Sequence, residues 1–341
     1  MAAPLTAAAL VFLIASAAGL ALALAMPIGA MVYALLACGV LHNVVELRFI
    51  GRRLGPLPGA LLGQLALLLT AIPAVRFAGL TGAFTAESAR ALEIALGYGL
   101  LVPIAGWLFH RDPRGQALGY GLGTLAAIIS LALPDWHFVA IAHLHNLGGA
   151  AVLTVLAFQR RHQARHLFAD AMGLVMLLVP ALILAGAFEG LIEPNWIAGR
   201  SIAGDPIGLA AAYAPPGAEA STALRWLTLF AYLQFVHYAL WLVVIPWLGP
   251  RLWPAHPHSA AEPIVGSRWY APAGIIAACV FAAWMAFDFP TGRGVYAACA
   301  TFHAYIELPV LLMLLAATRQ PLPALAPYSA GVSWATGAKC E

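Results

Sequence analysis

Apolar residues fill ten long runs of this 341-residue chain, and the short segments between the runs collect charged residues, proline and glycine. A helix that crosses a bilayer needs roughly 17–25 mainly apolar residues. Each run therefore predicts one membrane-spanning helix. The predicted spans are Leu5 to Met26, Ile28 to Ile50, Pro56 to Val75, Ala91 to Phe109, Ala117 to Leu133, Phe138 to Phe158, Phe168 to Phe188, Leu224 to Leu248, Ala271 to Phe287 and Val295 to Thr318.

The composition agrees with this pattern, because 62% of the residues are apolar and only 9% are charged. Such a composition excludes an ordinary soluble domain. We expect an all-α fold, a polytopic integral membrane bundle of about 10 transmembrane helices, since a helix satisfies its own backbone hydrogen bonds in lipid. Residues 1–320 are predicted to form one transmembrane domain, and residues 321–341 a short cytoplasmic tail.

The basic residues predict the orientation of the chain, because Lys and Arg accumulate in cytoplasmic loops. With the N-terminus inside, 12 of the 17 basic residues fall on the cytoplasmic side. Both termini are then cytoplasmic, and the chain is expected in the cell (inner) membrane. The same short-loop placement argues against a nucleic-acid partner. The 12 residues are Arg48, Arg52, Arg53, Arg111, Arg114, Arg160, Arg161, Arg165, Arg251, Arg268, Arg319 and Lys339.

Two spans carry a histidine and a glutamate four residues apart, His42 with Glu46 and His303 with Glu307. Residues at this spacing lie on one face of a helix. Ionisable side chains are costly at membrane depth and usually mark a functional site. We therefore expect these two helices to face a shared polar centre.

The sixth span adds His143 and His145, which point in different directions because they are two residues apart on a helix. At most one of them is expected to join the polar centre. His145 is favoured, because Asn146 and the glycines at 148 and 149 predict a close helix contact beside it.

The eighth span adds a polar stripe at helical spacing, formed by Gln234, His237, Tyr238 and Trp241. Together these four spans predict a metal site, because imidazole and carboxylate groups facing into a helix bundle suit iron, manganese or zinc. Gln234 and Tyr238 are the candidate catalytic groups beside it. The candidate metal ligands are His42, Glu46, His143, His145, His237, His303 and Glu307.

Glu46 and His143 are the weakest of these candidates. Glu46 lies closer to the cytoplasmic end of its span, where it has an alternative partner in Arg48, Arg52 or Arg53. The remaining histidines, His137 among them, fall near helix ends or in loops and are interpreted as interfacial residues.

Three functions are compatible with this pattern. The first is a non-haem metal enzyme, with iron as the expected cofactor, that oxidises a lipophilic substrate and takes electrons from a donor protein or a quinone. The chain lacks the clustered HxxxH boxes of membrane fatty-acid desaturases. The second is a redox subunit in which the histidines bind haem b and which exchanges electrons with quinone. The third is a proton- or cation-coupled transporter with a His/Glu relay, which broken helices at Gly148-Gly149 or Pro180 would support.

The longest connection, residues 189–222, is rich in glycine, proline and small residues and is predicted to lie on the outer side. A loop of this length is usually functional or mobile. It is interpreted either as a lid over a central cavity or as a linker between two helix bundles.

Overall fold

The computed structural model describes residues 2–53, 59–108, 112–159, 165–192, 204–256, 259 and 261–319. Within these ranges the protein consists of helices joined by turns and contains no strand. Ten helical segments are long and apolar enough to cross a membrane. The all-α fold class and the expected ten span-like helices are therefore confirmed, while insertion into a membrane and the orientation of the termini stay predictions. The proposed tail at 321–341 lies outside the described residues.

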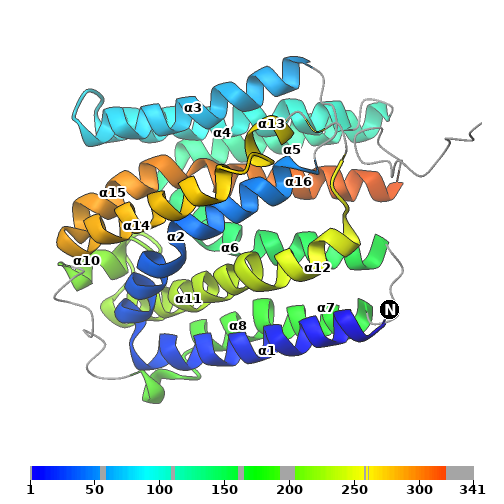
Figure 1. Ribbon diagram of the computed structural model, residues 1–341. Coiled ribbons are helices and arrows are strands. Elements are labelled where there is room, and N and C mark those ends of the chain that lie inside the picture. The colour runs from blue at the N-terminus through cyan, green and yellow to red at the C-terminus, as the bar shows by residue number, and fades with distance from the viewer. Residues whose placement is uncertain are drawn as a thin grey trace, which may run out of the picture.

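The ten long segments run side by side across the view of Figure 1. Their bounds are α1 Ala2–Ala25, α2 Pro27–Gly51, α3 Gly59–Leu80, α4 Ala86–Leu108, α5 Pro113–Ala132, α6 Pro134–Gln159, α7 Arg165–Gly173 continued by η1 Leu174–Leu178 and α8 Val179–Leu184, α11 Ala220–Ala239 continued by η3 Leu240–Val244 and α12 Ile245–Leu252, α14 Tyr270–Phe287, and α15 Phe289–Ala300 followed by α16 Phe302–Arg319. The short elements are η2 Glu189–Leu191, α10 Pro206–Ala211 and α13 Glu262–Val265. Residues 193–203 of the predicted long outer loop lie outside the described ranges.

Four helices, α2, α6, α11 and α16, form the centre of the bundle. Helix α11 packs against α2 and α6, and α16 packs against α6 and α2. In Figure 1 the helices α1, α7 and α8 lie on one side of this centre, and α3, α4 and α5 lie on the other. In the most apolar 18-residue stretch of the segment that begins with α11, 78% of the residues are buried. In the corresponding stretch of α5, 6% are buried. The polar stripe of α11 is therefore surrounded by protein.

Two of the long segments contain a π-turn directly before a proline. In η1 the Val179 N–H bonds the carbonyl of Leu174, and in η3 the Ile245 N–H bonds that of Leu240. Pro180 and Pro246 follow. A proline ring clashes with the carbonyl four residues earlier and has no N–H to offer it, so a locally wider turn relieves the clash and lets the helix continue. π-turns also occur frequently at functional sites.

The tenth predicted span, Val295 to Thr318, is not a single helix, because it is interrupted at Thr301 between α15 and α16. The Ala304 N–H bonds Thr301 O at 3.2 Å rather than the carbonyl of Ala300. The Thr301 hydroxyl bonds the carbonyl of Ala297. The break leaves the Ala300 carbonyl available to a side chain, immediately before His303.

Candidate metal centre

Each of the four central helices contributes one histidine to a closed ring of imidazoles, His42, His145, His237 and His303, called here the four-histidine cluster. The centroid of the His42 ring lies 5.1 Å from that of His237 and 5.1 Å from that of His303. The His145 centroid lies 5.3 Å from His237 and 5.2 Å from His303. The distance across the ring, from His237 to His303, is 6.3 Å.

Three of these rings are oriented by their own helices. In His42, His145 and His303, Nδ1 lies within hydrogen-bond distance of a backbone carbonyl of the preceding turn. A carbonyl oxygen only accepts hydrogen bonds, so Nδ1 carries the proton and Nε2 keeps its lone pair. The three acceptors are Cys38 O at 3.2 Å, Ile141 O at 2.8 Å and Ala300 O, the carbonyl freed by the break at Thr301.

The Nε2 atoms of His42 and His303 consequently face each other, at 3.4 Å. Two lone pairs at this distance repel each other unless a cation lies between them. Two nitrogen ligands about 2.1 Å from one metal ion, at a tetrahedral angle, are about 3.4 Å apart. The observed separation thus fits two ligands of a single ion.

Glu46 completes the group. It is fully buried, with a relative exposure of 0%, and one ligand atom each of Glu46, His42, His237 and His303 lies within 4.8 Å of the others. Neither carboxylate oxygen of Glu46 and neither ring nitrogen of His237 has a hydrogen-bond partner. A buried polar atom without a partner destabilises a fold, and a bound cation would provide a partner for the carboxylate of Glu46 and for one ring nitrogen of His237. These four residues could hold a metal ion, with His145 beside them.

Glu307 lies at the edge of this group. Its Oε1 accepts a hydrogen bond of 3.0 Å from the indole N–H of Trp241, while its Oε2 has no partner. A Cβ atom at Gly148 would lie 2.2 Å from that Oε2, and one at Gly149 would lie 3.1 Å from the Trp241 nitrogen. The two glycines therefore make room for the Trp241–Glu307 pair against the backbone of α6.

Of the two candidate catalytic groups, Tyr238 contacts His42 directly and Gln234 contacts Tyr238. The Tyr238 ring packs on the His42 ring with centroids 4.4 Å apart. The Gln234 side-chain amide donates to the Tyr238 hydroxyl at 2.8 Å. The pair therefore fixes the position of His42. Asn146 instead donates to the Ala142 carbonyl of its own helix at 2.8 Å.

His143, one of the candidate ligands, is turned away from the cluster. Its Nε2 lies 2.9 Å from the carbonyl oxygen of Tyr213, and its ring packs edge-on against Trp226 with centroids 4.9 Å apart. Two residues on a helix are separated by more than half a turn, so His143 and His145 face different helices. Of the two, the structure brings only His145 to the cluster.

Glu46, ranked low from the sequence, lies in the centre of the group, and two of the three nearby arginines have other partners. Arg52 pairs with Glu262 at 2.9 Å. Arg53 donates to the carbonyls of Phe49, at 2.8 Å, and Trp253. Glu307, ranked higher, lies outside the group of atoms that approach within 4.8 Å.

A groove of about 560 Å³ reaches this region from the surface of the bundle, between α4, α5, α6 and α16. Its wall is mostly apolar and contains His145 and Glu307. Several of its apolar side chains are exposed, among them Leu144 at 61% and Leu308 at 46%. The groove thus connects the outer surface of the helices with the edge of the four-histidine cluster.

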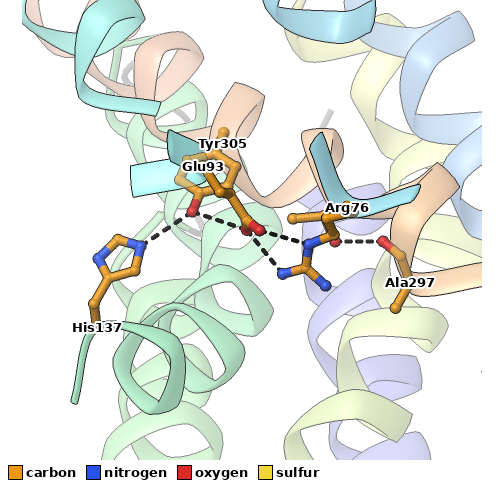
Figure 2. Close-up of polar contacts among 6 residues, drawn as sticks. Arg76, Glu93, His137, Ala297 and Tyr305 are labelled. Atoms are coloured by element: carbon orange, nitrogen blue, oxygen red, sulfur yellow. Dashed lines mark hydrogen bonds and ion pairs between the residues drawn. The ribbon is translucent and has the colours of Figure 1, made fainter. Parts of the chain in front are cut away.

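A second polar group, partly buried, lies nearby, and the sequence did not identify it. Figure 2 shows Arg76 paired with Glu93, Glu93 in contact with Tyr305, and Tyr305 in contact with His137. His137 was interpreted as an interfacial residue because it lies near a helix end. The available signal was Arg76 and Glu93, two opposite charges within or next to apolar runs.

No protein-family model, curated protein or solved structure matches this chain, and its function is therefore inferred from the geometry of the metal centre alone.

Proposed function

We propose that this protein is a multi-pass protein of the cell (inner) membrane, with cytoplasmic termini, that binds a non-haem metal ion and oxidises a lipophilic substrate. Iron is the proposed metal. The observation that carries the proposal is the convergence of imidazole nitrogens and the Glu46 carboxylate, all buried and several without a partner in the protein. Buried ionisable groups of this kind in a membrane helix are expensive to keep and mark functional sites.

In this proposal His42, His237, His303 and Glu46 hold the ion. Imidazole with carboxylate is the ligand combination of non-haem iron sites that activate dioxygen, and oxygen activation is the chemistry that the ion would supply. The electrons come from a donor protein or a quinone. His145 and Glu307 lie between the ion and the groove, so they contact the substrate first.

The other residues have positioning roles. Trp241 holds one oxygen of Glu307 and leaves the second oxygen directed at Gly148, on the groove side. Gln234 and Tyr238 keep the ring of His42 in place. Groups that orient metal ligands are worth about 10–100-fold in metal affinity or activity.

The groove supports the proposal that the substrate is lipophilic. Its lining is largely apolar and part of it is exposed on the outside of the bundle, where lipid would surround a membrane protein. A hydrophobic molecule dissolved in the bilayer can therefore enter sideways, without passing through water.

The ring spacing favours a non-haem ion over haem b. A haem with two axial histidines places the porphyrin plane between the two rings. For any pair in the four-histidine cluster, at least one further imidazole has its centroid within 5.3 Å of a member of that pair, and Glu46 occupies the same space. A porphyrin would overlap with these side chains.

The transporter alternative receives less support. Helix α6 continues without a break through Gly148 and Gly149, and the segment at Pro180 also continues as helix to Leu184. Neither of these two expected helix breaks is found, although the tenth span is interrupted at Thr301.

Metal analysis combined with an absorption spectrum on detergent-purified protein tests the proposal. We expect about one or two iron atoms per chain and no Soret band. A Soret band that shifts on reduction would refute the non-haem reading. Protein without metal that drives pH-dependent uptake in proteoliposomes would refute the enzyme itself.

A further inference from the structure

The shape of the groove selects an elongated ligand. Residues of α6 line it from Trp136 to Ala151 along one helix face, a length of about 22 Å at 1.5 Å per residue. This covers most of the roughly 30 Å hydrocarbon thickness of a bilayer. Its volume, 560 Å³, lies in the ordinary range of small-molecule sites. A single long hydrocarbon chain fits this form better than a compact ring system.

The charge of the groove selects an uncharged head group. Among the described residues, no lysine or arginine lines it, and Glu307 is the one acidic residue in its wall. A phosphate or carboxylate head would find no cation there, so phospholipids and ionised fatty acids are disfavoured. Polar contacts come from neutral groups at one end, Tyr98, Ser130 and His137.

At that end of the groove, the donor and the acceptor of each hydrogen bond can be assigned in turn, starting from Arg76. Its guanidinium donates twice to Glu93, at 2.7 Å and 2.8 Å, so Glu93 is a carboxylate that only accepts. The Tyr305 hydroxyl donates to Glu93 at 3.2 Å. Since its one proton is used there, Tyr305 accepts from His137 Nε2, at 3.0 Å. Figure 2 shows these four side chains in line.

The same assignment of donors and acceptors continues from His137 to the groove. A neutral imidazole carries one N–H, so Nδ1 of His137 accepts from the Ser130 hydroxyl at 3.1 Å. Ser130 in turn accepts from the Tyr98 hydroxyl at 2.9 Å. The Tyr98 hydroxyl thus donates its proton to Ser130, and only a lone pair of its oxygen is available to a ligand. A ligand with a donor, such as a hydroxyl group, matches it.

We propose that the groove binds a long-chain lipophilic alcohol, with its hydroxyl group donating to the Tyr98 oxygen and its chain lying along α6. His145 is eight residues beyond His137, about 12 Å further along the helix. An interior carbon of the chain, not the alcohol carbon, therefore lies beside His145 and Glu307. That this bound chain is the substrate rests on the proposed function, whereas its binding does not.

The test uses the full-length protein in nanodiscs and a 1-hexadecanol analogue with a photoreactive diazirine at mid-chain. We expect labelling on the groove wall near Leu144 and Leu308. Unlabelled 1-hexadecanol should compete about three- to tenfold better than hexadecyl methyl ether or hexadecanal, which cannot donate a hydrogen bond. The Tyr98→Phe variant should lose this preference, so that the three competitors become equal.

Tyr33→Phe is the matched control, because Tyr33 is 49% exposed on α2 and does not line the groove. It should keep the preference for the alcohol. The midpoint of thermal unfolding of both variants, measured in parallel, verifies that they are folded. Equal competition by the alcohol and the ether in the wild type would overturn the inference, as would labelling spread evenly to exposed residues of other helices such as Ile275.

The two proposals fail separately. Protein that contains no metal but prefers the alcohol leaves the groove assignment standing and removes the oxidation. Protein that contains iron and consumes oxygen but shows no preference for the alcohol removes the groove assignment alone.

Discussion

Two polar groups, one buried and one partly buried, lie within the same bundle, and they differ in whether the protein completes their hydrogen bonds. The Arg76–Glu93 pair and the chain from Tyr305 to Tyr98 complete their hydrogen bonds within the protein. The candidate metal centre does not. Among the described residues, every buried side-chain atom without a hydrogen-bond partner lies on α2, α6, α11 or α16: Asn43 Oδ1, both oxygens of Glu46, His143 Nδ1, Asn146 Oδ1, Gln234 Oε1, both nitrogens of His237 and Glu307 Oε2.

The contrast distinguishes polar groups that stabilise the fold from polar groups that are available to a ligand. A buried group that is satisfied within the protein contributes to stability and needs nothing more. A buried group that has no partner lowers stability, and a fold that keeps several of them together retains them for a ligand. The two regions should therefore respond to mutation in different measurements, metal content in one and unfolding in the other.

The largest expected effect is that of His303→Ala on the metal centre. This change removes a ligand nitrogen that lies 3.4 Å from His42 Nε2, so most of the bound metal and the activity should be lost while the protein still inserts and folds. The measurement is metal content by mass spectrometry. His143→Ala is the control, because it changes a buried histidine of a neighbouring helix that faces Tyr213. Equal metal content in the two variants would contradict the assignment.

Glu93→Gln should give the reverse result. It removes the charge that Arg76 pairs with, and charge-assisted hydrogen bonds are worth about 1.5–3 kcal/mol. We expect a lower midpoint of thermal unfolding with unchanged metal content. Glu87→Gln, an exposed change in the first turn of α4, should leave both quantities unchanged. Loss of metal in Glu93→Gln would show that the two regions are not independent.

Gly148→Ala tests the edge of the metal centre. The added Cβ would lie 2.2 Å from Glu307 Oε2 and must displace that carboxylate, and overpacking of this kind costs about 1–3 kcal/mol. Activity should fall more than metal content, because Glu307 is outside the group of closest ligand atoms. Gly121→Ala adds a Cβ that meets no atom within 4 Å, so its activity should equal that of the wild type.

The smallest effect is expected for Trp241→Phe, which removes the hydrogen bond to Glu307 and little volume. One such bond is worth about 1 kcal/mol, so activity should fall several-fold with the metal retained. Trp247→Phe, on the partly exposed face of α12, serves as the control. If Trp241→Phe were as active as the wild type, the indole would have no role in positioning Glu307.

The fold was largely predictable from the sequence, because each span depends on the apolar content of its own residues. The ten predicted runs correspond to the ten segments of the structure. The local backbone conformation, in contrast, cannot be predicted from the apolar periodicity. The π-turns before Pro180 and Pro246 and the break at Thr301 arise from proline sterics and competing carbonyl bonds, and they shift side chains without changing the apolar pattern.

The candidate site was predictable in composition but not in detail. The spacing of His42 with Glu46, and of His303 with Glu307, predicts a shared face, and the structure brings both helices to the centre. Which residues approach most closely depends on neighbouring helices. Glu46 could be ranked only after the partners of Arg52 and Arg53 were known, and His137 only after α16 had placed Tyr305 beside it.

The break at Thr301 affects how the candidate metal centre would bind an ion. It frees the carbonyl that fixes His303, so this ring is ordered before any metal arrives. Ordering a side chain on binding costs about 0.5–1.5 kcal/mol, and the His303 ring is already ordered in the folded protein. A rigid set of imidazoles benefits every divalent ion alike, and copper and zinc bind such sites more tightly than iron does. The identity of the bound metal is therefore expected to depend on which ion the cell supplies during assembly, more than on the affinity of the finished protein.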